Sequence, residues 1–188
     1  MKNKGMLIVY TGCSGVGKGT IMKELLPRNP NLRLSVSATT RAPRAGEVDG
    51  REYYFVTPER FDEMIAEGAF LEYAKYAGGS YGTPKEPVFR MLDEGYDVIL
   101  EIEVKGFLQV KQACPDCLTI FIAPPSFEEL EARLRKRGTE TEEKIAERLK
   151  IAEKELKSQD QFDHVVVNDI AQRAADEVLS IIAAEKNK

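Results

Sequence analysis

Residues 6–20 read MLIVYTGCSGVGKGT, and this stretch decides the fold that we expect for the chain. Met6–Tyr10 is a short apolar run, typical of a parallel strand that is covered on both faces. Residues 21–26 then carry apolar side chains at helical spacing. Between the two, residues 12–18 have the Gly-x-x-x-x-Gly-Lys spacing of a phosphate-binding loop, in the strand-to-helix context that this motif requires.

The loop is suited to an anion. Its glycines let the backbone turn N–H groups inward, the start of the helix adds partial positive charge, and Lys18 supplies a full charge. A glycine turn that binds nothing is the alternative, and the lysine behind a strand argues against it. We therefore expect a nucleoside triphosphate on the loop residues, which are Gly12, Cys13, Ser14, Gly15, Val16, Gly17, Lys18, Gly19 and Thr20.

One position in the loop departs from the common pattern, and another carries a cysteine. The Ser or Thr that usually follows the lysine and reaches Mg²⁺ is replaced by Gly19, and a hydroxyl comes one place later, at Thr20. Thr20 is therefore the candidate for the metal side. Cys13 lies near inward-facing N–H groups and Lys18, so we expect a thiolate that reacts faster than a surface cysteine; a small side chain that only fills space is the alternative.

The composition is that of one globular domain in a reducing compartment. The 188 residues are 43% hydrophobic and 31% charged, and the net charge of −4 argues against general affinity for nucleic acid or anionic membranes. The sequence has no apolar run of about 18 residues, and MKNKGM leads into the first strand without a signal-peptide cleavage region. With three cysteines, the chain is expected to be cytoplasmic.

Cys114 and Cys117 have Cys-x-x-Cys spacing. A zinc site would need about four ligands, and the sequence offers neither a second cysteine pair nor more than one histidine. A redox motif would normally open a helix, whereas this pair precedes an apolar run. We expect a turn before a strand.

Strand and helix patterns alternate along most of the chain, which predicts an α/β fold: a parallel sheet covered by helices on both faces. The expected strands are Leu7–Thr11, Arg33–Ser37, Val98–Ile102, Leu118–Ile122 and Val165–Val167. The expected helices are 18–26, 104–113, 126–137, 141–157 and 171–184. Residues 41–85 break the rhythm with short strands, a helix near 58–66 and a Gly-Gly turn, which favours a small mixed β insertion.

Two further groups of side chains are candidates for a site. Arg41 and Arg44 are three apart in a loop that Pro43 stiffens, and paired guanidinium groups suit a phosphate, although solvated surface charge is the alternative. Glu101 and Glu103 are two apart on a strand and should point to the same side, into the crevice at its carboxyl end; a charged strand end in solvent is the alternative.

From about Gly5 to Ala184 the chain closely resembles the guanylate kinase family of P-loop nucleoside monophosphate kinases. The resemblance is carried by SVSATTRAPRAGEVDGREYYFV (35–56), FLEY (70–73), YGT (81–83), ILEIE (99–103) and RGTE (137–140). It implies a P-loop kinase fold in one domain over residues 1–188. Its parts would be a core (5–37, 86–125 and 159–184), a GMP-binding β insertion (38–85) and a helical lid (126–158).

The resemblance also implies roles for particular residues. ATP would lie on the loop and near Asn168, and the GMP phosphate would be gripped by Arg41, Arg44, Tyr53 and Tyr81. Guanine would be read by Ser37, Glu72 and Thr83, since one carboxylate can accept from both the N1–H and the amino group, whereas adenine offers an acceptor at N1. Glu101 and Glu103 complete the GMP set. The family usually has Asp at the second position, so a base contact and a metal-bound water both stay open for Glu103.

The implied reaction transfers the γ-phosphoryl group of Mg-ATP to GMP, and also to dGMP, in purine nucleotide metabolism. A phosphate monoester is already an anion, so positive charge matters more than a general base; the expected catalytic residues are Lys18, Arg41 and the lid arginines Arg133, Arg137 and Arg148. A monomer or homodimer without nucleic-acid or membrane partners is expected. A catalytically inactive protein-binding module and a kinase for another phosphorylated acceptor are the alternatives, against which the intact loop, the arginines and Glu72 with Ser37 argue.

Overall fold

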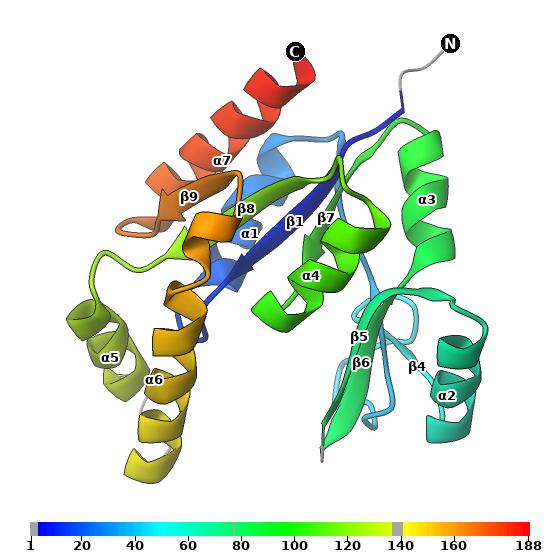
Figure 1. Ribbon diagram of the computed structural model, residues 1–188, viewed down its shortest axis with the longest axis horizontal. Helices are drawn as coiled ribbons and strands as arrows, with labels where there is room; N and C mark the ends of the chain where they lie inside the picture. The colour runs from blue at the N-terminus through cyan, green and yellow to red at the C-terminus, as the bar shows by residue number, and fades with distance from the viewer. Residues whose placement is uncertain (1–3, 77, 137–140) are drawn as a thin grey trace.

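Five parallel strands form the central sheet of the computed structural model, which describes residues 4–76, 78–136 and 141–188 (Figure 1). The order across the sheet is β2-β7-β1-β8-β9. The bounds are β1 Leu7–Gly12, β2 Leu32–Leu34, β7 Asp97–Glu101, β8 Leu118–Ala123 and β9 His164–Val167. Every residue of β1 and β8 is buried, as the apolar runs predict.

Helices cover both faces of this sheet, because successive side chains of a strand point to opposite sides. Ile8 and Tyr10 of β1 enter one hydrophobic core, and Leu7 and Val9 enter the other. The first core is closed by α1, α5, α6 and α7, and the second by α3 and α4. The bounds are α1 Lys18–Leu25, α3 Lys85–Asp93, α4 Val104–Ala113, α5 Phe127–Lys136, α6 Glu142–Leu156 and α7 Ala171–Lys186. Short 3₁₀ turns lie at Leu26–Arg28 and Gln159–Gln161.

A second sheet of four strands lies beside the first, in the order β4-β3-β6-β5. It is mixed, since β3 pairs with β4 in parallel and with β6 in antiparallel fashion. The helix α2 packs on it around a small core of Ala38, Phe61 and Phe70. The bounds are β3 Ser37–Thr39, β4 Tyr53–Phe55, α2 Pro58–Ala66, β5 Phe70–Tyr76 and β6 Gly79–Pro84. In Figure 1 this sheet lies on one side of the carboxyl ends of the central strands, and α5 with α6 lies on the other.

The predicted α/β fold and its mixed β insertion are confirmed, with two differences. The strand expected over 33–37 is β2 over 32–34, after which the chain crosses to the second sheet, so that Ser37 begins β3. The helix α3 is an addition to the predicted elements. Pro87 lies in its first turn, where a missing N–H costs little, and Val88 and Leu92 are buried one turn apart.

Two smaller expectations also have an outcome. Cys114 and Cys117 flank a turn, with Cys117 N–H donating to the Cys114 carbonyl (3.1 Å) just before β8, as predicted. Across residues 4–76, 78–136 and 141–188, every helix falls short of the length and apolarity that a membrane span requires.

Phe61→Ala tests whether the second sheet depends on its small core. The Phe61 ring is fully buried and its centroid lies 4.6 Å from that of Phe70, so the truncation should lower the free energy of unfolding by about 3 kcal/mol in urea denaturation. Leu108→Ala is the control, because that side chain is 60% exposed and its loss should change stability by less than about 0.5 kcal/mol. Equal effects of the two substitutions would contradict this description of the core.

Candidate active site

The phosphate-binding loop joins β1 to α1. Gly17 forms the N-cap of α1 with φ of 98°, a left-handed conformation that favours glycine, and a Cβ there would lie 2.6 Å from Asn168 Nδ2. Asn168 follows β9, is only 5% exposed and donates from Nδ2 to the Val16 carbonyl at 2.7 Å. Asn168, which follows the end of β9, therefore holds the loop in shape.

Lys18 is held inside the mouth of the loop. Its ammonium donates to the carbonyl of Gly12 at 2.6 Å and reaches that of Cys13 at 3.4 Å. Burial lowers the pKa of Lys18, and the carboxylate of Glu101 acts against that shift. Among the residues that the structure describes, carbonyl oxygens are the only hydrogen-bond partners of this ammonium, and a desolvated cation gains when an anionic oxygen takes their place.

A cavity of about 360 Å³ opens beside the loop. Thr20 is exposed there, and Arg133 of α5 lies on its wall. The lining residues on the loop and around it are Gly15, Val16, Gly17, Thr20, Arg133, Lys136, Asn168, Asp169 and Ala171.

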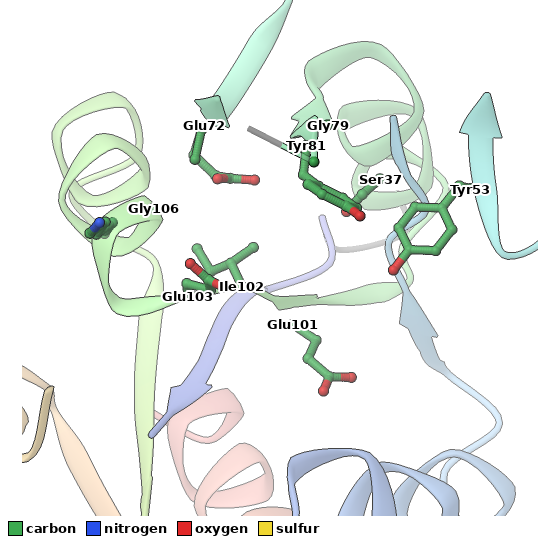
Figure 2. A pocket seen from close by; sticks show the side chains of 12 residues that line it. Ser37, Tyr53, Glu72, Gly79, Tyr81, Glu101, Ile102, Glu103 and Gly106 are labelled. Carbon is green, nitrogen blue, oxygen red and sulfur yellow. The ribbon is translucent and has the colours of Figure 1, made fainter. Parts of the chain in front are cut away.

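A larger cavity of about 530 Å³ lies between the second sheet and the carboxyl end of β7 (Figure 2). Ser37 and Tyr53 reach it from neighbouring positions of β3 and β4, and Tyr53 meets Tyr81 edge to face with centroids 5.9 Å apart. A third cavity of about 360 Å³ shares Ser37, Tyr53, Glu101 and Glu103 with it and also contains Lys18. The loop lysine and the second sheet therefore line adjoining cavities with a shared wall.

Glu72 is the carboxylate of the larger cavity that lies deepest. It is 8% exposed, and Thr83 donates its hydroxyl to Glu72 Oε1 at 2.7 Å. Burial raises the pKa of Glu72; the Thr83 hydrogen bond opposes that shift and Glu103 adds to it. Thr83 itself is fully buried, so its hydroxyl holds the Glu72 carboxylate from the protein interior.

The two arginines of the loop after β3 do not converge in this state. The Arg41 guanidinium makes two hydrogen bonds to Glu47, at 2.8 and 2.9 Å, and lies over the Tyr53 ring, 5.1 Å from its centroid. Glu47 also accepts from the Arg44 backbone N–H at 2.7 Å, and Arg41 lowers its pKa to about 2. The Arg44 side chain is exposed. Sequence reasoning missed Glu47, whose signal was an acidic residue in the same short loop.

Helix α6 is anchored to the loop through Ser14. Arg148 of α6 donates from Nε and Nη2 to Ser14 Oγ, at 3.1 and 2.7 Å. Glu155, two turns further along the same face of α6, accepts from the Ser14 N–H at 3.4 Å, and burial raises its pKa. Glu155 was not predicted, although its spacing of seven from Arg148 was visible. Arg137 lies outside the described residues.

The prediction that Glu101 and Glu103 lie on one strand and point to the same side is wrong. Glu101 is the last residue of β7, but Glu103 lies beyond the strand as the N-cap of α4. Figure 2 shows their carboxylates pointing in different directions, although both line the cavity. The strand ends early because Val104 already begins a helix.

The prediction of a reactive thiolate at Cys13 is also wrong. Its side chain is 0% exposed and belongs to the hydrophobic core beneath the loop. Burial raises its pKa to about 11 and outweighs the nearby Lys18, which acts in the opposite direction.

Comparisons with known proteins agree on one family. The family model described as "Guanylate kinase" matches residues 4–185. The guanylate kinase of Caldanaerobacter subterraneus subsp. tengcongensis is 53% identical over 99% of this chain and 90% of its own length, and that of Clostridium tetani is 54% identical over 97% and 88%. The crystal structure of guanylate kinase from Anaplasma phagocytophilum superposes with a TM-score of 0.78 at 33% identity, covering 100% of this chain and 89% of that one.

Alkylation of the folded protein tests the burial of Cys13. With iodoacetamide at pH 8, Cys114 should be labelled first, because it is half-buried, whereas Cys13 should react only after denaturation. Peptide mass spectrometry before and after urea gives the order. Labelling of Cys13 in the native protein as fast as Cys114 would restore the reactive-thiolate interpretation.

Proposed function

The chain belongs to the guanylate kinase family, and we propose from this how its cavities position ATP and GMP. The reaction transfers the γ-phosphoryl group from ATP to GMP and gives ADP and GDP. The observation that carries the proposal is that the cavity of Lys18 adjoins the cavity of Glu72 and shares Tyr53 and Glu101 with it. A donor on the loop and an acceptor in the cavity of Glu72 would bring their phosphates together at the Lys18 ammonium.

The acceptor base would be read by Glu72. Guanine presents an N1–H and an amino group side by side, and a carboxylate can accept from both. Thr83 fixes one carboxylate oxygen, and Ser37 lies on the same wall. Adenine would place an acceptor against this carboxylate, so the cavity favours guanine. dGMP shares that base, and the same contacts would admit it.

The acceptor phosphate would lie toward Tyr53, Tyr81 and Arg41. Glu47 now occupies the guanidinium fork of Arg41 with the bidentate geometry that a phosphate also uses. A dianionic phosphate offers that fork more charge than one carboxylate, so GMP would compete with Glu47 for it. Arg44, exposed three residues away, would join when the loop closes.

The donor would bind on the loop, with Asn168 close by and Thr20 on the metal side. Mg²⁺ takes hard oxygen ligands and usually keeps several waters while it binds substrate phosphates. The exposed hydroxyl of Thr20 fits this mode, and the residues that the structure describes contain no cluster of three or more metal-ligating side chains that would hold the ion alone. The ion, arriving with ATP, would neutralise phosphate charge during transfer.

Catalysis would come from positioned positive charge. Lys18 and Arg41 act on the two phosphates, and Arg133 and Arg148, with Arg137 from outside the described residues, would close over the transferring group. Closure would also exclude water, which would otherwise hydrolyse ATP.

The setting of the enzyme is a further part of the proposal. The three cysteines are free, as expected in a reducing compartment, so we place the enzyme in the cytoplasm. It would act on small nucleotides as a monomer or homodimer, without nucleic-acid or membrane partners.

Lys18→Ala tests the loop assignment. Loss of one preorganised charge contact should cost at least about 3 kcal/mol of transition-state stabilisation, which is more than about 100-fold in kcat/KM for ATP in a coupled assay of ADP release. Lys23→Ala is the matched control, because that lysine is exposed on the same helix. Near-normal turnover of Lys18→Ala would remove the loop from the mechanism.

A pH series tests Glu72. Its pKa is raised, so GMP affinity should be complete above that pKa and be lost as the pH falls through it, at a higher pH than an ordinary glutamate would require. Glu72→Gln should weaken GMP about 10- to 100-fold at pH 8.

The ratio of the GMP affinity of the wild type to that of Glu72→Gln isolates the effect of the Glu72 carboxyl group. The phosphate of GMP titrates identically with both proteins and cancels in this ratio. Calorimetry from pH 8 downward should show the advantage of the wild type shrinking toward one. A ratio that is independent of pH would exclude the ionised Glu72 carboxylate from base recognition.

A further inference from the structure

Helix α4 of the core holds the strand that carries Glu72. The side-chain amide of Gln109 pairs with both backbone groups of Tyr73: Nε2 donates to the Tyr73 carbonyl at 3.0 Å, and Oε1 accepts from the Tyr73 N–H at 3.1 Å. β5 is the edge strand of its sheet, so this one amide supplies the donor and acceptor that a neighbouring strand would supply. The residue next to Glu72 is thereby fixed to the core.

Gly106 lies one turn before Gln109, on the same face of α4. A Cβ at Gly106 would lie 2.6 Å from Glu72 Oε2, 3.1 Å from its Cδ and 3.2 Å from its Cγ. The Glu72 side chain therefore lies directly against the first turn of α4; Figure 2 shows both residues at the cavity. Any added side chain would have to displace the carboxylate.

Glu72 has little room to move aside. Its other oxygen is held by Thr83, and the register between β5 and β6 shifts between Phe70 and Glu72. That irregularity inserts Leu71, which is buried in the core beneath α4. Strict strand alternation therefore does not decide where the Glu72 side chain points. The contact with α4 decides its direction.

The backbone does not explain the glycine. Gly106 lies inside a helix and has no left-handed conformation, and alanine is the better helix former by up to about 1 kcal/mol. The close approach of Glu72 is the reason that the structure offers.

We propose that Gly106 and Gln109 are positioning residues for nucleobase specificity: together they form a seat on α4 that sets the Glu72 carboxylate for guanine. This inference rests on the proposed role of Glu72. It predicts that changes on the core helix, away from the phosphates, alter which base is accepted while leaving ATP use intact.

The test compares Gly106→Ala and Gln109→Ala with Gln112→Ala, a matched control because Gln112 is exposed on the same helix. Steady-state kinetics would use ATP with GMP and with IMP, which lacks the amino group. Both variants should raise the KM for GMP about 10-fold or more, lower the GMP/IMP ratio of kcat/KM, and leave the KM for ATP within about 2-fold. The melting temperature of Gly106→Ala should fall by no more than a few degrees, because the higher helix propensity of alanine offsets part of the cost of crowding Glu72.

A double variant adds a rescue. Glu72→Asp shortens the side chain, so in the Gly106→Ala background the two losses should be less than additive. Gln109→Ala adds no atoms and keeps the proposal testable if Gly106→Ala fails to fold.

The outcomes separate the two levels of the proposal. If Glu72→Gln leaves GMP kinetics unchanged, the role of Glu72 fails, and the seat with it. If Glu72→Gln weakens GMP while Gly106→Ala and Gln109→Ala keep wild-type KM and GMP/IMP selectivity, only the seat is overturned. A parallel loss of ATP and GMP use with a lower melting temperature would also overturn it, because that pattern indicates general damage.

Discussion

The Lys18 ammonium, which is partly buried and among the described residues is hydrogen-bonded only to backbone carbonyls, is the constraint on which the rest of the structure depends. Lys18 donates to carbonyls of its own loop, at 2.6 Å for Gly12, and burial lowers its pKa. Two parts of the fold hold the loop around this ammonium. β1, which leads into the loop, is buried along its whole length, and Asn168 donates to the Val16 carbonyl of the loop. A phosphate oxygen would supply the charge that the carbonyls cannot.

The parallel sheet brings the proposed donor and acceptor sides to this ammonium. β1 ends in the loop and its neighbour β7 ends in Glu101, so both arrive at the same edge. The chain leaves the central sheet after β2, forms the second sheet and returns to the core at α3. This path places Ser37, Tyr53 and Glu72 opposite that edge. Helix α4 packs on β1 and also holds β5 through Gln109, so the position of Glu72 is set relative to the edge where the loop and Glu101 meet.

Much of this was visible in the sequence, for local reasons. Apolar runs and helical spacing fix α/β alternation, and glycine with lysine at set spacing fixes the loop. The misses have two causes: contacts that form only when the chain folds and, for Glu103, the start of the next helix. Cys13 is unreactive because a core closes beneath it, Glu103 leaves the strand because α4 begins there, and Glu47 and Glu155 are recognised only by the partners that folding brings to them. Gly106 carries no signal until Glu72 lies against it.

A crystal structure with ADP and GMP bound measures the central claim most directly. The account predicts that a phosphate oxygen of ADP replaces the Gly12 carbonyl at Lys18, and that guanine presents its N1–H and amino group to Glu72, which is still held by Thr83. Guanine bound elsewhere, or Lys18 still donating to Gly12 with ADP on the loop, would contradict it.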